Sequence, residues 1–144
     1  MMSKYVLLKN DSNVEVKKLE EKLELETMYD WISGGCRCID IAVSVISPKM
    51  GCEVLLIFDD EFLLNNNEPK ANEIASLLFG YDFIRKECLC GNVIIAKVDG
   101  SETVGFTDEE LKKLQKILNT CKKMAAMTRF VVQKPCFTFI PGTF

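Results

Sequence analysis

Two pairs of cysteines come closest, by residue type and spacing, to a chemical site in this sequence. Cys36 and Cys38 lie one residue apart in GGCRCID, and Cys88 and Cys90 repeat that spacing in ECLCGN. Four thiolates are a complete ligand set for zinc, and an extended strand would turn both sulfurs of a pair to one face. Structural zinc sites, however, usually have two to four residues between paired cysteines. We therefore expect buried apolar residues and no metal, with a four-thiolate zinc site as the alternative.

Other catalytic groups are hard to assemble from this chain. It contains no histidine, which removes the commonest general base and the commonest neutral metal ligand. The carboxylates of FDDEF, residues 58–62, are neighbours along the chain, and neighbours on a strand point to opposite faces. The sequence has no nucleophile elbow and no glycine-rich phosphate loop. We predict a protein that is not an enzyme and uses no cofactor.

The composition is that of one globular domain over residues 1–144. Hydrophobic residues make up 48% and charged residues 27%, and the net charge is −3 with lysines and acids interleaved, so we do not expect nucleic acid as a partner. No apolar run approaches the ~18 residues needed to cross a bilayer, and the N-terminus lacks the regions of a signal peptide. We expect a cytoplasmic protein, with its seven cysteines reduced and no membrane contact.

The periodicity of apolar residues predicts an α+β fold, in which two or three helices cover a mixed or antiparallel sheet. We expect strands at 4–9, 13–19, 36–46, 52–58, 92–98 and 129–140, and helices at 21–35, 70–80 and 106–127. Thr107 and Glu110 form a capping box at the start of the long last helix. The strand that follows this helix contains Pro135, which predicts an edge position or a bulge.

The strand expected at 36–46 alternates between two kinds of side chain. The polar Asp40 shares one face with the first cysteine pair. The opposite face carries the aliphatic residues Ile39, Ile41, Val43 and Val45. We expect Pro48 and Gly51 to end this strand.

Two further segments are candidates for binding. The loop NNNEPKAN would line a small-ligand or nucleotide pocket with Asn67 and Asn72, where a helix N-terminus could receive an anion. Near the C-terminus, Phe137 and Phe139 share one strand face and Phe144 is the last residue, so these aromatic side chains would anchor a protein partner. Closure of the protein core is the other interpretation of the same aromatic residues.

Four stretches together resemble a family of small proteins from phages and mobile elements of Gram-positive bacteria, known only as a domain of unknown function. They are KYVLLKNDSNVEVKKLE, LETMYDWISGG, VLLIFDDEFLLNNNEPKANEIA and CGNVIIAKVDGSETVGFTDEELKKL. The resemblance covers about residues 4–118 and leaves 119–144 as a C-terminal extension. The asparagine and glycine that recur in the family match Asn72 and Gly91. The resemblance implies a setting beside antirestriction and conjugation functions and implies no catalytic residues.

The residues and the resemblance together predict a non-catalytic accessory protein of a phage or mobile element. We expect it to bind a protein encoded by the host or by the element, and a component of a host defence system is one such target. Association of two copies into a homodimer is a further alternative. One alternative is a nucleotide or small-ligand binder that uses Asn67 and Asn72. The other is a structural zinc protein that uses Cys36, Cys38, Cys88 and Cys90.

Overall fold

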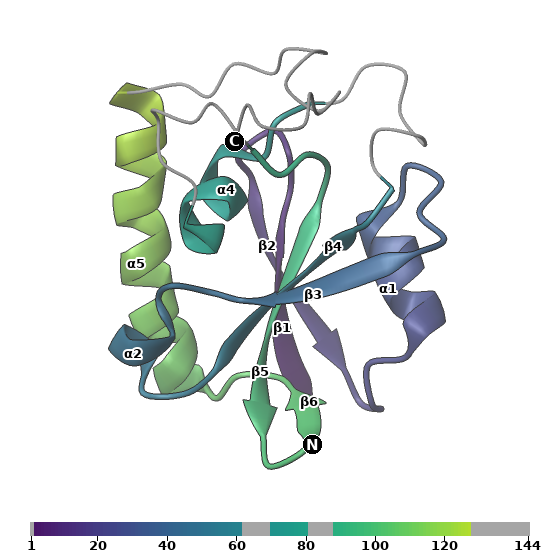
Figure 1. Cartoon of the computed structure of the whole chain (residues 1–144). Coiled ribbons are helices and arrows are strands. Elements are labelled where there is room, and N and C mark those ends of the chain that lie inside the picture. Colours follow the sequence, from purple (N-terminus) through teal and green to yellow (C-terminus); the bar gives the residue numbers. More distant parts are fainter. Residues whose placement is uncertain (1, 62–69, 81–87, 128–144) are drawn as a thin grey trace, which may run out of the picture.

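A computed structural model of the chain describes residues 2–61, 70–80 and 88–127, and its helices and strands carry the labels of Figure 1. The strands are β1 (Ser3–Leu8), β2 (Val14–Leu19), β3 (Ile39–Val43), β4 (Val54–Asp59), β5 (Val93–Asp99) and β6 (Glu102–Val104). The helices are α1 (Leu25–Ile32), α2 (Ser47–Met50), α4 (Glu73–Phe79) and α5 (Asp108–Met127). The predicted α+β class is confirmed.

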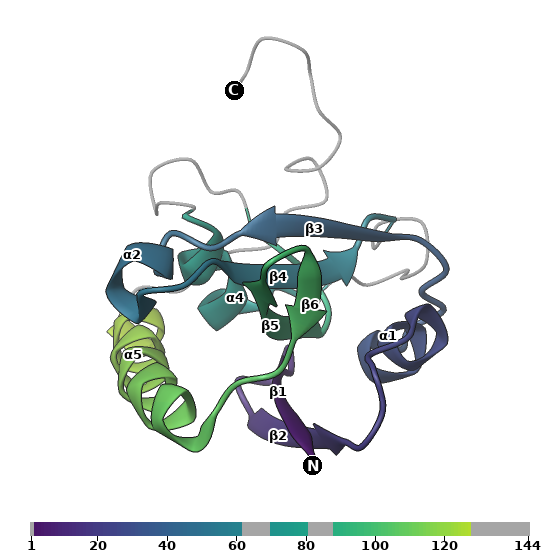
Figure 2. The ribbon, with the colours of Figure 1, turned by 90° about the horizontal axis from the view of Figure 1, so that it is seen from below.

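All six strands belong to one sheet, and every pairing between them is antiparallel. The strand order is β2-β1-β5-β4-β3, with β6 pairing to the second half of β5. All six residues of β4 are buried, which fits its near-continuous apolar sequence VLLIFD. The two outermost strands of the sheet are therefore β2 and β3, which lie at opposite rims in Figure 2.

Helices cover both faces of the sheet because its central strands carry apolar side chains on both faces. Residues of one parity, such as Val6 on β1 and Ile95 on β5, pack against α2, α4 and α5. Residues of the other parity, such as Tyr5 and Ile94, pack against α1 on the opposite side (Figure 2). Burying one such aliphatic side chain contributes about 1.5–3 kcal/mol, so the two apolar layers hold the helices in place.

The long helix α5 begins as its sequence predicts and is tied to the sheet by charge. The backbone N–H of Glu110 donates to Thr107 Oγ1 (3.2 Å), and the N–H of Thr107 donates to Glu110 Oε1 (2.8 Å), which confirms the capping box. The Lys97 ammonium on β5 lies 2.6 Å from the same Glu110 oxygen. Burial acts to raise the pKa of Glu110, but the hydrogen bonds from Lys97 and Thr107 outweigh it and lower the pKa.

The strand expected at 36–46 is shorter in the structure, and this part of the prediction is wrong. Only Ile39–Val43 forms β3, and the chain then turns into α2, a helical turn that the sequence analysis does not predict. The cause is a contact with α4, where the Leu78 carbonyl accepts hydrogen bonds from the Ser44 hydroxyl (2.7 Å) and the Val45 N–H (3.0 Å). Ser44 itself stays paired with the start of β4, because its N–H donates to the Val54 carbonyl (2.8 Å).

The other expected elements are confirmed, apart from one strand that lies outside the described residues. The strands expected at 4–9, 13–19, 52–58 and 92–98 and the three expected helices are present, with ends shifted by a few residues. The short strand β6 is an addition to the predicted set. The strand expected at 129–140 lies outside the described residues.

We predict that Gly105→Ala destabilises the fold. A Cβ atom at Gly105 would lie 2.7 Å from both the backbone nitrogen and the backbone oxygen of Lys4. The two chain segments are held at this short distance because the N–H of Phe106 donates to the Lys4 carbonyl. Backbone atoms cannot give way as a flexible side chain does, so we expect a loss of about 1–3 kcal/mol in the free energy of unfolding. Chemical denaturation measures it. The control, Ser101→Ala in the exposed β5–β6 turn, should change stability by less than about 0.5 kcal/mol. Equal stability of the two variants would contradict the close approach.

Candidate functional site

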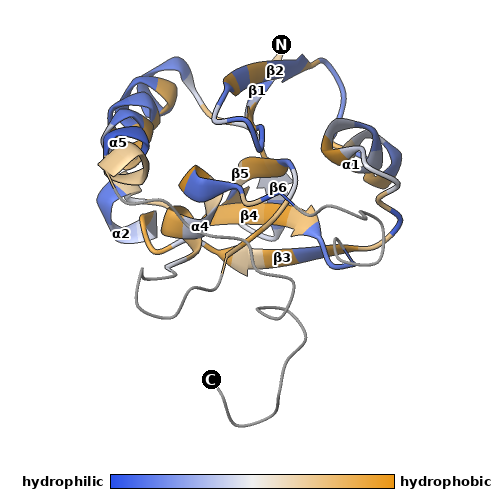
Figure 3. Ribbon diagram, turned by 90° about the horizontal axis from the view of Figure 1, so that it is seen from above, coloured by the Kyte–Doolittle hydropathy of each residue, from blue (hydrophilic) through white to orange (hydrophobic). Residues whose placement is uncertain are grey.

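The two outer strands of the sheet differ in how their edges are protected. On β2, Glu15 lies 3.7 Å from the ammonium of Lys9 and 3.3 Å from that of Lys17, and charges of this kind discourage pairing with another strand. On β3, Ile41 and Val43 are 45% and 52% exposed. Val45, just past the strand, is 57% exposed. Figure 3 shows β3 coloured mainly as hydrophobic at its rim of the sheet. We call Ile41, Val43, Val45 and the outer backbone of β3 the β3 edge.

The backbone of β3 presents a regular set of hydrogen-bonding groups at this edge. The Cys38 carbonyl accepts from the Asp60 N–H (3.0 Å), and the Ser44 N–H donates to the Val54 carbonyl (2.8 Å). Alternate residues of a strand direct their backbone groups to the same side, so even-numbered residues face β4. The N–H and C=O groups of Ile41 and Val43 therefore point outward, and no described strand pairs with them.

One backbone N–H of the β3 edge is already hydrogen-bonded to a side chain. Asp40 Oδ1 accepts a hydrogen bond from the N–H of Ile41 at 2.8 Å. This bond satisfies an outward donor in the middle of the strand and must break before another strand can pair there. Asp40 thus protects the edge locally, at the N–H of Ile41.

The beginning of β3 is acidic. Cys38 precedes the strand and is exposed, and the charge of Glu61, with smaller effects from its hydrogen bond and from Asp60, raises the pKa of the Cys38 thiol. Asp40 adds a third carboxylate on the strand itself. An extended segment that binds here meets negative charge at one end and aliphatic side chains at the other.

The end of β3 is held rigidly by α4. The two hydrogen bonds to the Leu78 carbonyl fix Ser44 and Val45, and the Ser44 side chain is buried. Gly80 follows α4 with a φ of +104°, and a Cβ atom there would lie 2.8 Å from Val45 Cγ1. A residue with a side chain would therefore strain the backbone and crowd the β3 edge.

The four cysteines that could form a zinc site do not come together. Cys36 packs with residues of α1, and its thiol donates to the Cys38 carbonyl (3.6 Å). Burial, followed by the charge of Asp59, raises the pKa of Cys36 to about 11. Cys88 and Cys90 are buried where the chain enters β5, and Cys90 bridges to Ala71 before α4.

Within residues 2–61, 70–80 and 88–127, no group of three or more histidine, cysteine, aspartate and glutamate residues is placed to hold a metal ion. The expectation of buried apolar cysteines is confirmed for Cys36, Cys88 and Cys90. It is wrong for Cys38, because the chain enters β3 only after this residue and leaves its side chain outside the core.

Asn72, a residue proposed to bind a ligand, is part of the framework. Its Nδ2 atom donates to the carbonyls of Leu8 (2.9 Å) and Gly91 (2.8 Å), and its Oδ1 atom accepts from the N–H of Ala75 (3.1 Å). The residue is 1% exposed, and both of its donors are used. This arrangement joins β1, α4 and the start of β5. It favours a structural role, and ligand binding at Asn72 stays a prediction.

The remaining predicted site residues fall outside the described part of the chain. These are Asn67, Phe137, Phe139 and Phe144.

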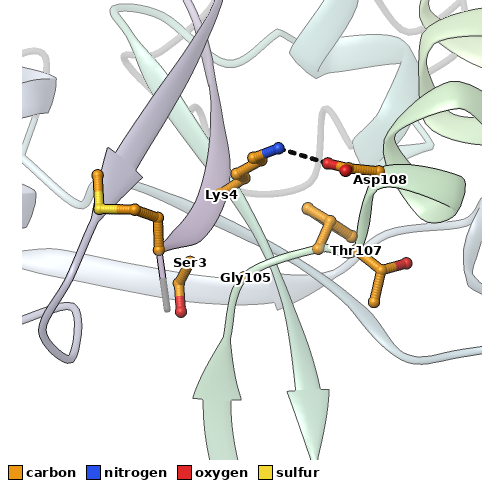
Figure 4. Close-up of a pocket in the computed structure, with 7 residues that line it drawn as sticks. Ser3, Lys4, Gly105, Thr107 and Asp108 are labelled. Atoms are coloured by element: carbon orange, nitrogen blue, oxygen red, sulfur yellow. Dashed lines mark hydrogen bonds and ion pairs between the residues drawn. The ribbon is translucent and has the colours of Figure 1, made fainter.

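A pocket of about 540 Å³ lies between the start of β1 and the connection from β6 to α5 (Figure 4). Lys4 and Asp108 line it and form an ion pair with each other, and this contact lowers the pKa of Asp108. Gly105 and Phe106 form part of its wall. The charges of Lys4 and Asp108 neutralise each other. These two side chains therefore give the pocket no net charge that would attract a charged ligand. We find the β3 edge the stronger candidate.

We predict that Asn72→Ala lowers the free energy of unfolding by at least about 2 kcal/mol, because it removes a helix cap and leaves two buried carbonyls without their donor. Urea denaturation is the measurement. The matched control is Asn119→Ala, which removes an exposed bond from Gln115 (3.1 Å) and should cost less than about 0.5 kcal/mol. An Asn72→Ala protein as stable as the control would refute the structural role.

No helix in the described residues is long and apolar enough to cross a membrane. No curated protein and no solved structure matches the sequence. Comparison with protein families matches residues 2–119, which is most of the chain, to a domain of unknown function, DUF3846. The chain therefore belongs to the DUF3846 family.

Proposed function

We propose that this protein is a non-catalytic accessory protein that binds another protein by adding a strand at the β3 edge. The observation that carries the proposal is the exposure of Ile41 and Val43 on a strand whose outward backbone groups have no described strand beside them. An extended peptide gains main-chain hydrogen bonds at such an edge, and alternate side chains supply specificity.

The chemistry of the edge specifies the partner. Aliphatic or aromatic side chains at alternate positions would pack beside Ile41 and Val43, since residues directly opposite on paired strands share a face. Binding must also release Asp40 from the N–H of Ile41. A lysine or arginine on the partner would form ion pairs with the carboxylates of Asp40, Asp60 and Glu61. The partner is thus an extended apolar segment with a basic residue near one end.

The biological setting belongs to the same proposal. The resemblance to small proteins of phages and mobile elements supports an accessory role in the cytoplasm, with a partner encoded by the host or by the element. A component of a host defence system is the target we propose. The DUF3846 match supports membership of a family whose domain has no known function.

We predict that the double variant Ile41→Lys, Val43→Lys loses its partner while keeping its fold. Both side chains are half exposed, so the free energy of unfolding should change by less than about 1 kcal/mol. The measurement is affinity capture of the full chain from a lysate of Gram-positive host cells, with quantification of the proteins retained.

The matched control is Val16→Lys, which changes an equally exposed valine (47%) on the opposite outer strand, β2. Wild type and the control should retain the same partner, and the double variant should not. A partner that the double variant retains at full yield would contradict binding through the β3 edge.

A further inference from the structure

Acidic and basic side chains gather on opposite sides of the folded chain. Residues 20–30, which lead into α1 and form most of it, contain five acids and one lysine, whereas residues 111–127 of α5 contain five lysines and no acid. Helices α1 and α5 cover opposite faces of the sheet (Figure 2). The net charge of −3 is therefore an average over an acidic side and a basic side.

The outward side of α5 carries basic and polar side chains along about three turns. From 111 to 123, the exposed residues are Lys112, Lys113, Gln115, Lys116, Asn119, Thr120, Lys122 and Lys123. At 3.6 residues per turn, Lys112, Lys116 and Lys123 lie within about 40° of one another around the helix axis and span about 17 Å along it. The buried side chains of α5 lie on the other side of the helix, toward the sheet. We call the five lysines of α5 the α5 lysine face.

The positive charge of this face is not neutralised within the described residues. Two acids of the first turn of α5 are paired with lysines of the sheet, Asp108 with Lys4 and Glu110 with Lys97. No ion pair between described residues includes a lysine of the α5 lysine face. The exposed Lys49 lies on α2, which packs against α5 and adds one more positive charge beside it. The helix therefore presents an excess of positive charge to a partner.

We propose that the α5 lysine face binds the phosphate backbone of duplex DNA without sequence preference. Duplex DNA carries one negative charge per about 1.7 Å of its axis, so a row of lysines about 17 Å long meets several phosphates. The neutral side chains between the lysines, Gln115, Asn119 and Thr120, are of types that also donate to phosphate oxygens. This surface uses none of the residues of the β3 edge, and the inference does not rest on the proposed function.

The composition of the helix narrows the partner to a duplex backbone. Residues 111–127 contain no aromatic residue and no arginine. Proteins that bind single strands stack the bases on aromatic side chains, and the hot spots of protein interfaces are enriched in tryptophan, tyrosine and arginine. The major groove of B-DNA, about 12 Å wide, admits an α-helix, whereas that of duplex RNA is too narrow for side chains to read. Lysine binds phosphate as a point charge, so we expect no preference for a base sequence.

The acids on the α1 side do not cancel this attraction at short range. Charges in water are screened over about 8 Å at physiological ionic strength. A helix is about 10 Å across, and both the sheet and α5 lie between residues 20–30 and a duplex bound to the outward side of α5. Repulsion from the acidic side is therefore largely screened in the complex. The uneven charge still orients the approach, because the basic side is drawn toward the DNA first.

Fluorescence anisotropy tests the inference, with the full chain titrated into a labelled DNA duplex at salt concentrations from about 50 to about 200 mM. Each phosphate contact releases counterions, so the salt dependence of the binding constant reports the number of contacts. The variant Lys112→Gln, Lys116→Gln, Lys123→Gln removes the three outermost charges of α5. Glutamine forms helices about as well as lysine, so the fold is kept, and circular dichroism checks this.

The matched control is Lys9→Gln, Lys17→Gln, Lys22→Gln, which removes the same charge from the β1–β2 hairpin and the connection to α1. Three phosphate contacts give a slope of about −2.7 in a plot of log binding constant against log salt concentration. Wild type and control should therefore bind about 40-fold more weakly at 200 mM than at 50 mM salt. The α5 variant should bind at least about tenfold more weakly than the control at 50 mM, with a slope reduced by roughly 0.9 per lysine.

Three outcomes would overturn the inference. The first is no binding of the duplex by the wild type at the lowest salt concentration. The second is an equal loss of affinity in the two triple variants, which would attribute binding to the overall charge rather than to α5. The third is binding of polyglutamate in place of the duplex, which would assign the face to an acidic protein. None of these results affects the capture experiment with Ile41→Lys, Val43→Lys, so the proposed function is tested separately.

Discussion

The arrangement of the sheet and its helices depends on the hydrogen bonds of the Asn72 side-chain amide. It donates to the carbonyls of Leu8 and Gly91 and caps α4 through Ala75, so one buried group fixes β1, β5 and α4 together. The C-terminal end of α4 then presents the Leu78 carbonyl to Ser44 and Val45. Through this short series of hydrogen bonds, the position of the β3 edge follows from the position of Asn72.

The same hydrogen bonds explain why Asn72 and Gly91, the two residues that match the family resemblance, lie next to each other in the structure. Asn72 and Gly91 are 19 positions apart and are joined by a direct hydrogen bond of 2.8 Å. Their role is to bring the start of α4 beside the start of β5, and the matched region 2–119 includes both of them.

The elements that the sequence predicts well are those with strong local patterns. The apolar runs of β1 and β4 and the capping box of α5 each need only neighbouring residues to be recognised. The zinc alternative was weakened by spacing alone, and the structure keeps the two cysteine pairs apart. Local pattern was also enough to identify Asn72 as a helix start, although not to show that its amide is fully bonded.

What the sequence does not predict depends on contacts between distant residues. The early end of β3 and the turn of α2 follow from bonds between Ser44 and Leu78, which are 34 positions apart. The exposure of Ile41 and Val43 follows from strand order, because the same aliphatic alternation would be buried on a central strand. The candidate site is therefore visible only once β3 is known to be an outer strand.

The claim at the centre of this account is that the outer side of β3 pairs with an extended segment. In an antiparallel pair, residues between the hydrogen-bonded positions bring their Hα atoms close together, with Cα atoms about 4.5 Å apart. The Hα of Ala42 points outward, so a partner strand that pairs with the β3 edge brings one of its own Hα atoms close to it. The account predicts a strong intermolecular NOE between these two protons in the complex with the protein partner. Its absence, with Ala42 and the partner assigned, would contradict binding of an extended segment at this edge.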